Sequence, residues 1–432
     1  MPVSVESTVL SFEDARRVVE EHAAKISPPS TESVELLVAA GCVLAEEIFA
    51  DRDIPPFPRS TRDGYAVRSA DLARIPATLE VIGEVRAGEK PEKIPAKVEP
   101  GQAVSIMTGA QVPTEADAVV MVEYTSRNAD QVEISRTITP GENIVPRGAE
   151  ARQGSRLLGR GVRLNEAAIA LSASVGKSRL QVYRKPRVAV LSTGDEIVGL
   201  KSIPGRTQIR NSNSYSLAVQ VLHAGGQPIL LPIAPDQPQR LRELIEQGLQ
   251  SDLLLMTGGV SMGRYDLVEQ VLTELGAEFF FTRAKIQPGK PVVFGRCGAR
   301  APARAGAQRQ SGTGQKASRK TTYFFGLPGN PVSTMVTFEL FVRPMIEALS
   351  GQLPRKLAFL HARLKFEIRV KPGLRRFLPA VLSGEFDQSE VELVPWQGSG
   401  DIAAVTRANC YIVVPPEREQ IAFGEWVSVM MR

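Results

Sequence analysis

Four short polar segments follow apolar stretches between residues 187 and 333, and their residue types suit phosphate or metal chemistry. They read STGDE (192–196), APD (234–236), TGGVS (257–261) and LPGNPVS (327–333). Glycine amides and small hydroxyl groups can approach an oxyanion closely. The candidate substrate-binding residues of these segments are Thr193, Gly194, Asp195, Gly258, Gly259, Ser261, Pro328, Gly329, Asn330 and Ser333.

Three acids lie in or just beyond these segments, namely Glu196, Asp236 and Asp266. Carboxylate oxygens are the hard ligands that suit Mg²⁺, and the same groups could act as acids or bases. Each acid alone could equally be surface charge, and each segment alone an ordinary turn. That plain interpretation is weaker for four segments together. The chain has only three histidines and no His/Cys cluster, which disfavours zinc or haem chemistry.

The segment LPGNPVS has the clearest structural interpretation. Asn330 can cap a following helix, Pro331 suits its first position, and Ser333 falls in its first turn. The free amides and the dipole of such a helix favour an anion. A well-capped helix without a ligand would have the same sequence.

The segment TGGVSMGRYD is not a conventional nucleotide-binding P-loop. Gly258 and Gly263 have the spacing of that motif, but Arg264 and Tyr265 stand where lysine and serine or threonine are required. A conventional ATPase is therefore disfavoured, although a phosphate could still rest on the amides of 258–261.

The elements that must position these segments alternate between strand and helix from Arg187 onward. Apolar runs predict strands at 187–192, 228–233, 252–257 and 323–327, and amphipathic stretches predict helices at 212–226, 238–250, 266–275 and 331–349. This alternation predicts an α/β fold with a doubly wound parallel sheet. Ligands of such sheets bind outside the carboxyl ends of the strands, so the four segments should meet at one edge.

The rest of the chain has a different character. Helices are predicted at 11–25 (capped by Ser11), 33–41 and 165–176. Residues 50–145 are rich in proline and glycine and contain short β-type pieces, so they predict an inserted β domain. The apolar residues alternate again after Leu353, which predicts a C-terminal β domain.

Composition excludes several classes of protein. A chain of 432 residues is too long for one core. It has no apolar run of about 18 residues that could span a membrane, and its first residues do not read as a secretory signal. Its three cysteines lie far apart in the sequence, at positions 42, 297 and 410, so no disulfide framework is indicated. A cytoplasmic location fits.

The basic net charge is local. Residues 298–320 hold six basic residues and no acid, which more than accounts for the net charge of +5. The segment is rich in Gly, Ala, Ser and Gln and has no apolar periodicity, so it predicts a disordered insertion. Without aromatic residues to stack on bases, nucleic-acid binding is a minority interpretation. Because the insertion precedes LPGNPVS, we expect it to overhang the cleft in which the four polar segments would meet.

Three further stretches could carry function. DGYA places Asp63 on a turn beside prolines, MTGA places Thr108 at the end of a β-strand, and PGKP places Lys290 after a Pro-Gly turn. A tight turn explains the first two equally well, and a solvated lysine explains the third.

Six motifs occur in one order, namely DGYA, MTGA, STGDE, GGVSMG…D, PGKP and LPGNPVS. Together they resemble the molybdopterin molybdenumtransferase family, which includes the E domain of gephyrin. The resemblance covers roughly residues 10–430. It implies a homodimer that takes adenylylated molybdopterin, releases AMP and loads molybdate onto the dithiolene with Mg²⁺. It also makes a molybdopterin adenylyltransferase a candidate partner. Neither a nucleic acid nor a membrane is expected as a partner.

The resemblance implies four parts: an elongated helical linker domain (1–49 and 146–180), an inserted β domain (50–145), an α/β molybdopterin-binding domain (181–352) and a C-terminal β domain (353–432). The inserted β domain of one subunit would face the α/β domain of the other. The catalytic residues would be Asp63, Thr108, Glu196, Asp236 and Asp266, the last three as metal ligands. Lys290, Ser333, Arg375 and Ser399 would contact substrate.

The chain departs from the family pattern near several of these positions. The family often has DNSAMDGYA where this chain has PRSTRDGYA, and it tends to carry an arginine where this chain has Pro379. Arg375 is therefore the expected anion contact. Two rival functions share the fold: molybdopterin adenylylation, and a non-catalytic scaffold. The two β domains speak against the first, and the retained acids speak against the second.

Overall fold

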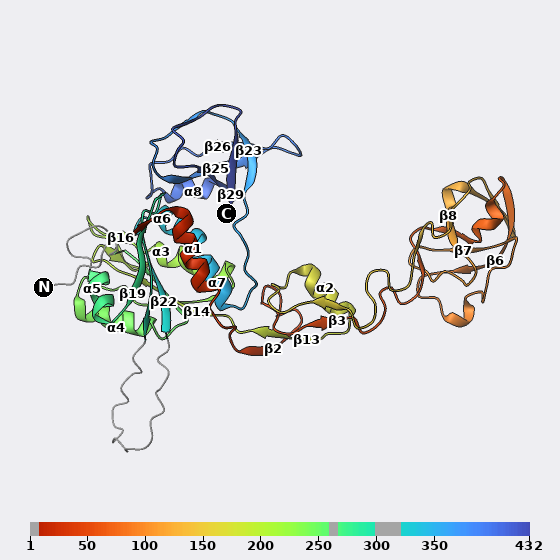
Figure 1. Cartoon of the computed structure of the whole chain (residues 1–432), viewed down its shortest axis with the longest axis horizontal. Helices are drawn as coiled ribbons and strands as arrows, with labels where there is room; N and C mark the ends of the chain where they lie inside the picture. The colour runs from red at the N-terminus through yellow and green to blue at the C-terminus, as the bar shows by residue number, and fades with distance from the viewer. Residues whose placement is uncertain (1–7, 259–266, 299–320) are drawn as a thin grey trace, which may run out of the picture.

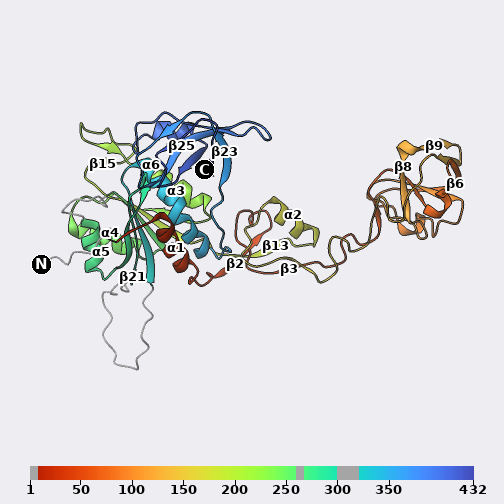
Figure 2. The same cartoon turned by 45° about the horizontal axis from the view of Figure 1, so that its top comes forward.

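The computed structural model describes residues 8–258, 267–298 and 321–432. Figure 1 shows an α/β region with the C-terminal β region beside it, and an inserted β region at the far end of an extended connector. The view in Figure 2 keeps the same separation. Among the described residues, no helix is long and apolar enough to cross a membrane.

A seven-stranded sheet forms the centre of the α/β region. In spatial order its strands are β1 (Val9–Leu10), β19 (Glu278–Ala284), β21 (Pro291–Gly298), β22 (Thr321–Leu327), β18 (Leu253–Thr257), β14 (Arg187–Ser192) and β17 (Gln227–Leu230). The four strands β22, β18, β14 and β17 pair in parallel, as predicted. Strand β21 runs antiparallel to both neighbours, so the sheet is mixed.

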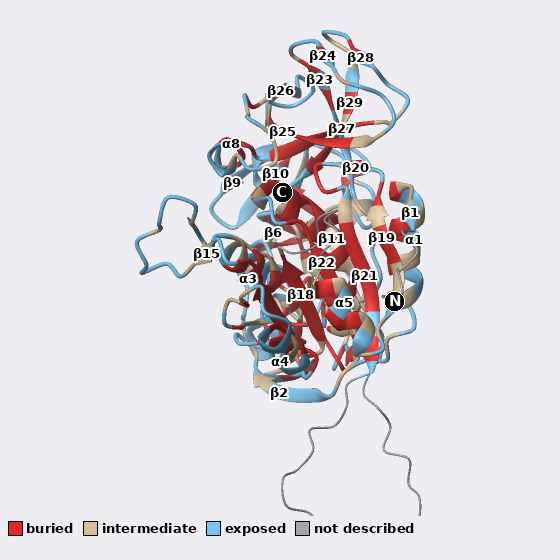
Figure 3. Ribbon diagram, turned by 90° about the vertical axis from the view of Figure 1, so that its left-hand side faces the viewer, coloured by how far each residue is buried: buried red, intermediate tan, exposed pale blue. Residues whose placement is uncertain are grey.

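Both faces of this sheet are covered by helices, which explains why its central strands β14 and β18 are buried along almost their whole length. Along β18, Leu253 and Leu255 belong to the cluster shared with α1 (Phe12–Ala23), α3 (Asn213–His223) and the helices after β22. Leu254 and Met256 belong to the cluster shared with α4 (Pro238–Gly248) and α5 (Leu267–Glu274). Buried residues accordingly fill the sheet in Figure 3.

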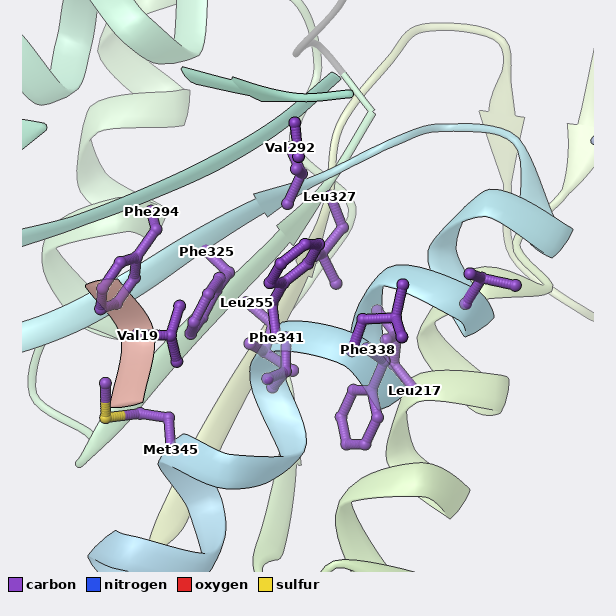
Figure 4. Packing of buried hydrophobic residues seen from close by; sticks show 14 of the residues in the cluster. Val19, Leu217, Leu255, Val292, Phe294, Phe325, Leu327, Phe338, Phe341 and Met345 are labelled. Carbon is purple, nitrogen blue, oxygen red and sulfur yellow. The ribbon is translucent and has the colours of Figure 1, made fainter. Parts of the chain in front are cut away.

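The predicted helix 331–349 is interrupted in the structure. It consists of α6 (Pro331–Thr337), a π-helical segment (Phe338–Val342) and α7 (Arg343–Leu349). Pro344 has no N–H to donate to the carbonyl of Leu340. The buried Arg16 donates to that carbonyl instead, at 2.5 Å from its Nη1. Figure 4 shows Phe338 and Phe341 of the π-helical segment packed beside the strands.

The N-terminal residues pack with the α/β region and not with the connector, contrary to the expected assignment of 1–49. Strand β1 pairs in parallel with β19, and Phe12, Ala15 and Val19 of α1 lie in the main hydrophobic cluster. Ser11 caps α1 as predicted, because its Oγ accepts from the Asp14 N–H at 3.0 Å. The other domain boundaries stay a prediction.

The connector is built from pairs of strands that are distant in sequence. Strand β2 (Thr31–Glu35) pairs with β13 (Arg179–Tyr183), and β3 (Ile48–Phe49) with β12 (Arg156–Leu158). The helix predicted at 33–41 is therefore wrong. Val34 packs in the connector cluster, whereas Leu37 is 82% exposed and so offers no buried helical face. The predicted helix at 165–176 is α2 (Glu166–Ser174), capped by Asn165.

Two six-stranded sheets form the inserted and C-terminal regions. The inserted region holds β8 (Ala118–Met121), β5 (Gly64–Val67), β7 (Gln102–Ile106), β6 (Ala77–Val85), β10 (Gln131–Ile134) and β9 (Thr125–Asn128). The C-terminal sheet holds β20 (Ile286–Gln287), β25 (Arg375–Ser383), β26 (Glu390–Leu393), β23 (Leu360–Leu364), β29 (Trp426–Met431) and β27 (Cys410–Val414). Pairing of β25 with β27 closes the C-terminal sheet into a barrel.

The basic insertion is anchored at the edge of the sheet away from the polar strand ends. Gly298 pairs with Thr321, the first residue of β22, whereas LPGNPVS begins at Leu327, the last residue of that strand. The insertion is therefore attached at the other end of β22 from the cleft, and the expectation that it overhangs the cleft stays a prediction. Residues 299–320 themselves lie outside the described residues.

We expect Leu255→Ala to lower the free energy of unfolding by about 2–5 kcal/mol, because it leaves a cavity in a fully buried part of the sheet. Denaturant unfolding of the full chain, followed by tryptophan fluorescence and circular dichroism, measures this. Leu37→Ala is the matched control and should change stability by less than about 0.5 kcal/mol. Equal effects of the two substitutions would contradict this assignment of the core.

Candidate functional site

The turns after β14, β17 and β18 meet at one edge of the sheet, as the sequence predicted. The Thr193 N–H donates to the Thr257 carbonyl at 3.0 Å, and the Gly194 N–H donates to the Ala234 carbonyl at 3.1 Å. These bonds extend the pairing of β14 beyond its last residue. Three of the four polar segments are thereby joined.

The fourth segment is joined to them through side chains. The Thr257 hydroxyl donates to the Pro328 carbonyl at 3.0 Å. The Asn213 Nδ2 donates to the Thr257 Oγ1 at 2.9 Å and to the Gly329 carbonyl at 2.7 Å. The LPGN turn is therefore held against the end of β18.

Two glycines make this close approach possible. Gly258 has φ +90°, and a Cβ atom at this position would collide with the Thr193 carbonyl oxygen. Gly194 has φ +129°, and a Cβ atom there would collide with the Glu196 carboxylate. A residue with a Cβ atom would strain the backbone at both positions. At position 258 it would also collide with a backbone carbonyl, whereas at position 194 the Glu196 side chain would have to move.

A cleft of about 340 Å³ lies between these turns. Six of the predicted site residues line it: Thr193, Glu196, Gly258, Pro328, Gly329 and Asn330. Residues that were not predicted also line it, among them Ser192, Arg210, Asn211, Ser212, Asn213 and Thr257. The predicted Gly259, Ser261 and Asp266 lie outside the described residues.

The cleft has few charges and several polar atoms without a partner. Glu196 and Arg210 are the only charged side chains among its described lining residues. Thr193 Oγ1 and Asn213 Oδ1 are buried, and neither has a hydrogen-bond partner among the described residues. Leaving such an atom unsatisfied costs about 1–3 kcal/mol, so both atoms favour a bound ligand or water.

Several predicted residues have a structural role and do not line the cleft. The Asp195 Oδ1 accepts from the Asp236 N–H at 3.1 Å, which ties two strand-end turns together. Both acids are exposed. Lys290 is exposed next to Pro291, which does line the cleft.

The start of α6 differs from the predicted capping. The Asn330 side chain makes no capping bond, and its Nδ2 donates instead to the Ser399 Oγ at 2.9 Å. The Val332 N–H donates to the Ser399 carbonyl at 3.0 Å. Ser333 is buried behind the turn. The C-terminal region therefore caps this helix, in place of its own first side chain.

Arg375 contacts two residues of the N-terminal helix α1. Its Nη2 pairs with Glu13 at 2.5 Å, and its guanidinium lies 5.5 Å from the centre of the Phe12 ring. It does not line the cleft. The anion contact at Arg375 stays a prediction.

Asp63 and Thr108 form a separate polar site in the inserted region. The Asp63 Oδ1 accepts from the Thr108 N–H at 2.6 Å and from the Thr108 hydroxyl at 2.9 Å. These two bonds, the backbone one first, hold the pKa of Asp63 below its ordinary value. Figure 1 shows β7, which precedes Thr108, far from β14, whose last residue lines the cleft of the same chain.

The side chains of the cleft could bind Mg²⁺ only if water or substrate oxygens complete its coordination. No three His, Cys, Asp or Glu side chains in the described part of the chain lie close enough to hold a metal ion. Glu196 does present a carboxylate to the cleft. Mg²⁺ is commonly bound by one or two carboxylates together with substrate phosphates and water, so these residues fit that mode.

The sequence prediction missed the wall formed by residues 210–213. This wall begins at the last residue of β16 (Ile209–Arg210). That short strand pairs with β15 (Ile197–Val198), which directly follows Glu196. A signal was present, since RNSNS is a polar stretch directly before a helix. Its contact with the cleft depends on the β15–β16 pairing, which spacing alone does not reveal.

Three family models match consecutive parts of the chain. They are the MoeA N-terminal region (domain I and II) over residues 10–176, the probable molybdopterin binding domain over 189–348, and the MoeA C-terminal region (domain IV) over 361–431. The cleft described above lies within the second match, and Asp63 and Thr108 lie within the first.

Relatives and solved structures agree with these models. The molybdopterin molybdenumtransferase of Haemophilus influenzae is 34% identical over 93% of this chain and 94% of its own length. That of Bacillus subtilis is 31% identical over 93% and 90%. The crystal structure of a molybdopterin biosynthesis MoeA protein from Pyrococcus horikoshii has a TM-score of 0.67 at 32% identity, covering 98% of this chain and 99% of that one. This chain belongs to the molybdopterin molybdenumtransferase family.

Proposed function

We propose that this protein is a cytoplasmic molybdopterin molybdenumtransferase. It takes adenylylated molybdopterin, releases AMP, and inserts molybdate into the dithiolene in a Mg²⁺-dependent reaction. The observation that carries the proposal is the cleft itself, where two glycine turns, the unpartnered Thr193 hydroxyl and the Glu196 carboxylate meet at the carboxyl ends of the strands. This cleft lies in a chain that matches all three family regions.

The roles of the cleft residues follow from their chemistry. Gly258 lets the backbone approach an oxyanion, and the unpartnered Thr193 hydroxyl can donate to one. Glu196 would hold Mg²⁺, with Asp236 and Asp266 as the further carboxylates that we propose. The bound ion would neutralise the pyrophosphate and activate water for its hydrolysis.

We also propose that the active protein is a homodimer with a shared site. Asp63 and Thr108 lie at the far end of the connector, so a partner subunit is needed to bring such residues to a cleft (Figure 1). A closed two-fold dimer places the same two surfaces against each other twice. An adenylyltransferase that makes the substrate would be a natural transient partner.

The two rival functions are less well supported. An adenylyltransferase needs only the α/β region, whereas this chain also matches the family over 10–176 and 361–431. A scaffold without catalysis has no need for unpartnered polar atoms inside a cleft.

The first test is AMP release from adenylylated molybdopterin. We expect release that requires Mg²⁺ and molybdate, and a loss of at least about a hundredfold in kcat for Glu196→Gln and for Asp266→Asn, because each removes a charge from the reacting site. Chromatography of the nucleotide products measures this. A folded dimer that releases no AMP would sink the transferase proposal and favour the scaffold.

The second test mixes two inactive subunits. Asp63→Ala and Glu196→Ala homodimers should each be inactive if each site uses Asp63 of one subunit and Glu196 of the other. Random exchange should then restore about a quarter of wild-type activity, because half of the dimers carry one intact site of two. Activity after denaturant-assisted exchange measures this. No recovery from verified mixed dimers would place both residues in one subunit's site.

The third test is the pH profile of Thr108→Val. The substitution removes the hydroxyl donor and keeps the backbone donor, so the pKa of Asp63 should rise part of the way to its ordinary value. If ionised Asp63 is required, the acidic limb of the profile of kcat/KM should move to higher pH. Thr108→Ser keeps both donors and should leave the limb in place. A shift in the opposite direction would contradict the role of these bonds.

A further inference from the structure

Residues 210–213 form one wall of the cleft. The proposed function assigns no role to them. All four of them line the cleft. Two of their side chains present opposite hydrogen-bonding character, because Arg210 can only donate and Asn213 has an acceptor to offer.

The hydrogen bonds of Asn213 fix which way its amide faces. Its Nδ2 lies 2.7 Å from the Gly329 carbonyl, and a carbonyl can only accept. The same Nδ2 lies 2.9 Å from the Thr257 Oγ1, whose own hydrogen is donated to Pro328. The amide nitrogen must therefore face this turn. The Oδ1 is left as a buried acceptor without a partner among the described residues.

Arg210 is anchored in a way that leaves its outer nitrogens available. Its Nε donates to the carbonyls of Leu200 and Ser202, each at 3.2 Å. Within the part of the chain that the structure describes, no bond or ion pair occupies its two Nη groups. The side chain is exposed, and it is the only positive charge among the described lining residues.

These two groups suit different ends of one ligand. Phosphate oxygens accept hydrogen bonds, so they match the guanidinium and are repelled by a carboxamide oxygen. A pterin ring carries N–H donors, which match an acceptor. We propose that the wall sets the direction of the substrate, with Arg210 binding its pyrophosphate and Asn213 Oδ1 accepting an N–H of its pterin. This inference rests on the proposed function, because it takes the substrate from it.

The test measures the binding of each end separately, without turnover. Inorganic pyrophosphate at fixed free Mg²⁺, and 6-hydroxymethylpterin without phosphate, are titrated into the full-length dimer by ligand-observed NMR. Arg210→Gln should weaken pyrophosphate about tenfold and leave the pterin unchanged. Asn213→Ala should weaken the pterin about fivefold and leave pyrophosphate unchanged. This crossed pattern can be read even if AMP release fails, so the two proposals are tested independently.

Two control variants separate recognition from loop structure. Arg206→Gln makes the same charge change in the same loop, at an exposed residue outside the cleft lining, and should alter neither probe. Thr257→Val removes one of the two bonds that hold the Asn213 nitrogen and keeps its Oδ1, so the pterin should bind better than in Asn213→Ala. Equal weakening of both probes by both wall variants, or no binding of either probe to the wild type, would overturn the proposal.

Discussion

The arrangement of the cleft depends on how closely two strand-end turns can approach. The Thr193 carbonyl occupies the space where a side chain at position 258 would lie, so the turn after β18 can sit against the turn after β14 only with glycine there. That spacing also lets the Thr257 hydroxyl reach Pro328, which brings in the third turn. A rigid sheet edge then holds donors, acceptors and a carboxylate in place before a ligand arrives, which lowers the ordering cost of binding.

The strand ends could be predicted from local sequence, because the same few residues determine where each strand ends and which chemical groups it presents there. Thr193, Gly258 and Pro328 directly follow β14, β18 and β22, and a parallel sheet must bring such ends together. The role of Asn330 could not be found this way. Its partner Ser399 belongs to another region, and no local rule can weigh a cap of its own against one supplied from there.

The other predictions failed at places where contacts between residues distant in sequence determine the local structure. Residues 31–35 form a strand because β13 pairs with them, and that partner lies more than a hundred residues away in sequence. Arg16 satisfies the carbonyl that Pro344 leaves free, so the interruption of the long helix involves a residue from the far end of the chain. Arg210 and Asn213 were overlooked for a similar reason, since the β15–β16 pairing carries them to the cleft.

The position of β1 and α1 also has a consequence for synthesis on the ribosome. These elements leave the exit tunnel well before their partners, which are β19 and the Leu340 carbonyl. At an elongation rate of about 5–20 residues per second, the intervening chain takes on the order of half a minute to appear. During that time the apolar face of Phe12, Ala15 and Val19 has no native surface to cover it. A nascent chain of this design gains from a chaperone that holds its first helix until the α/β core can close.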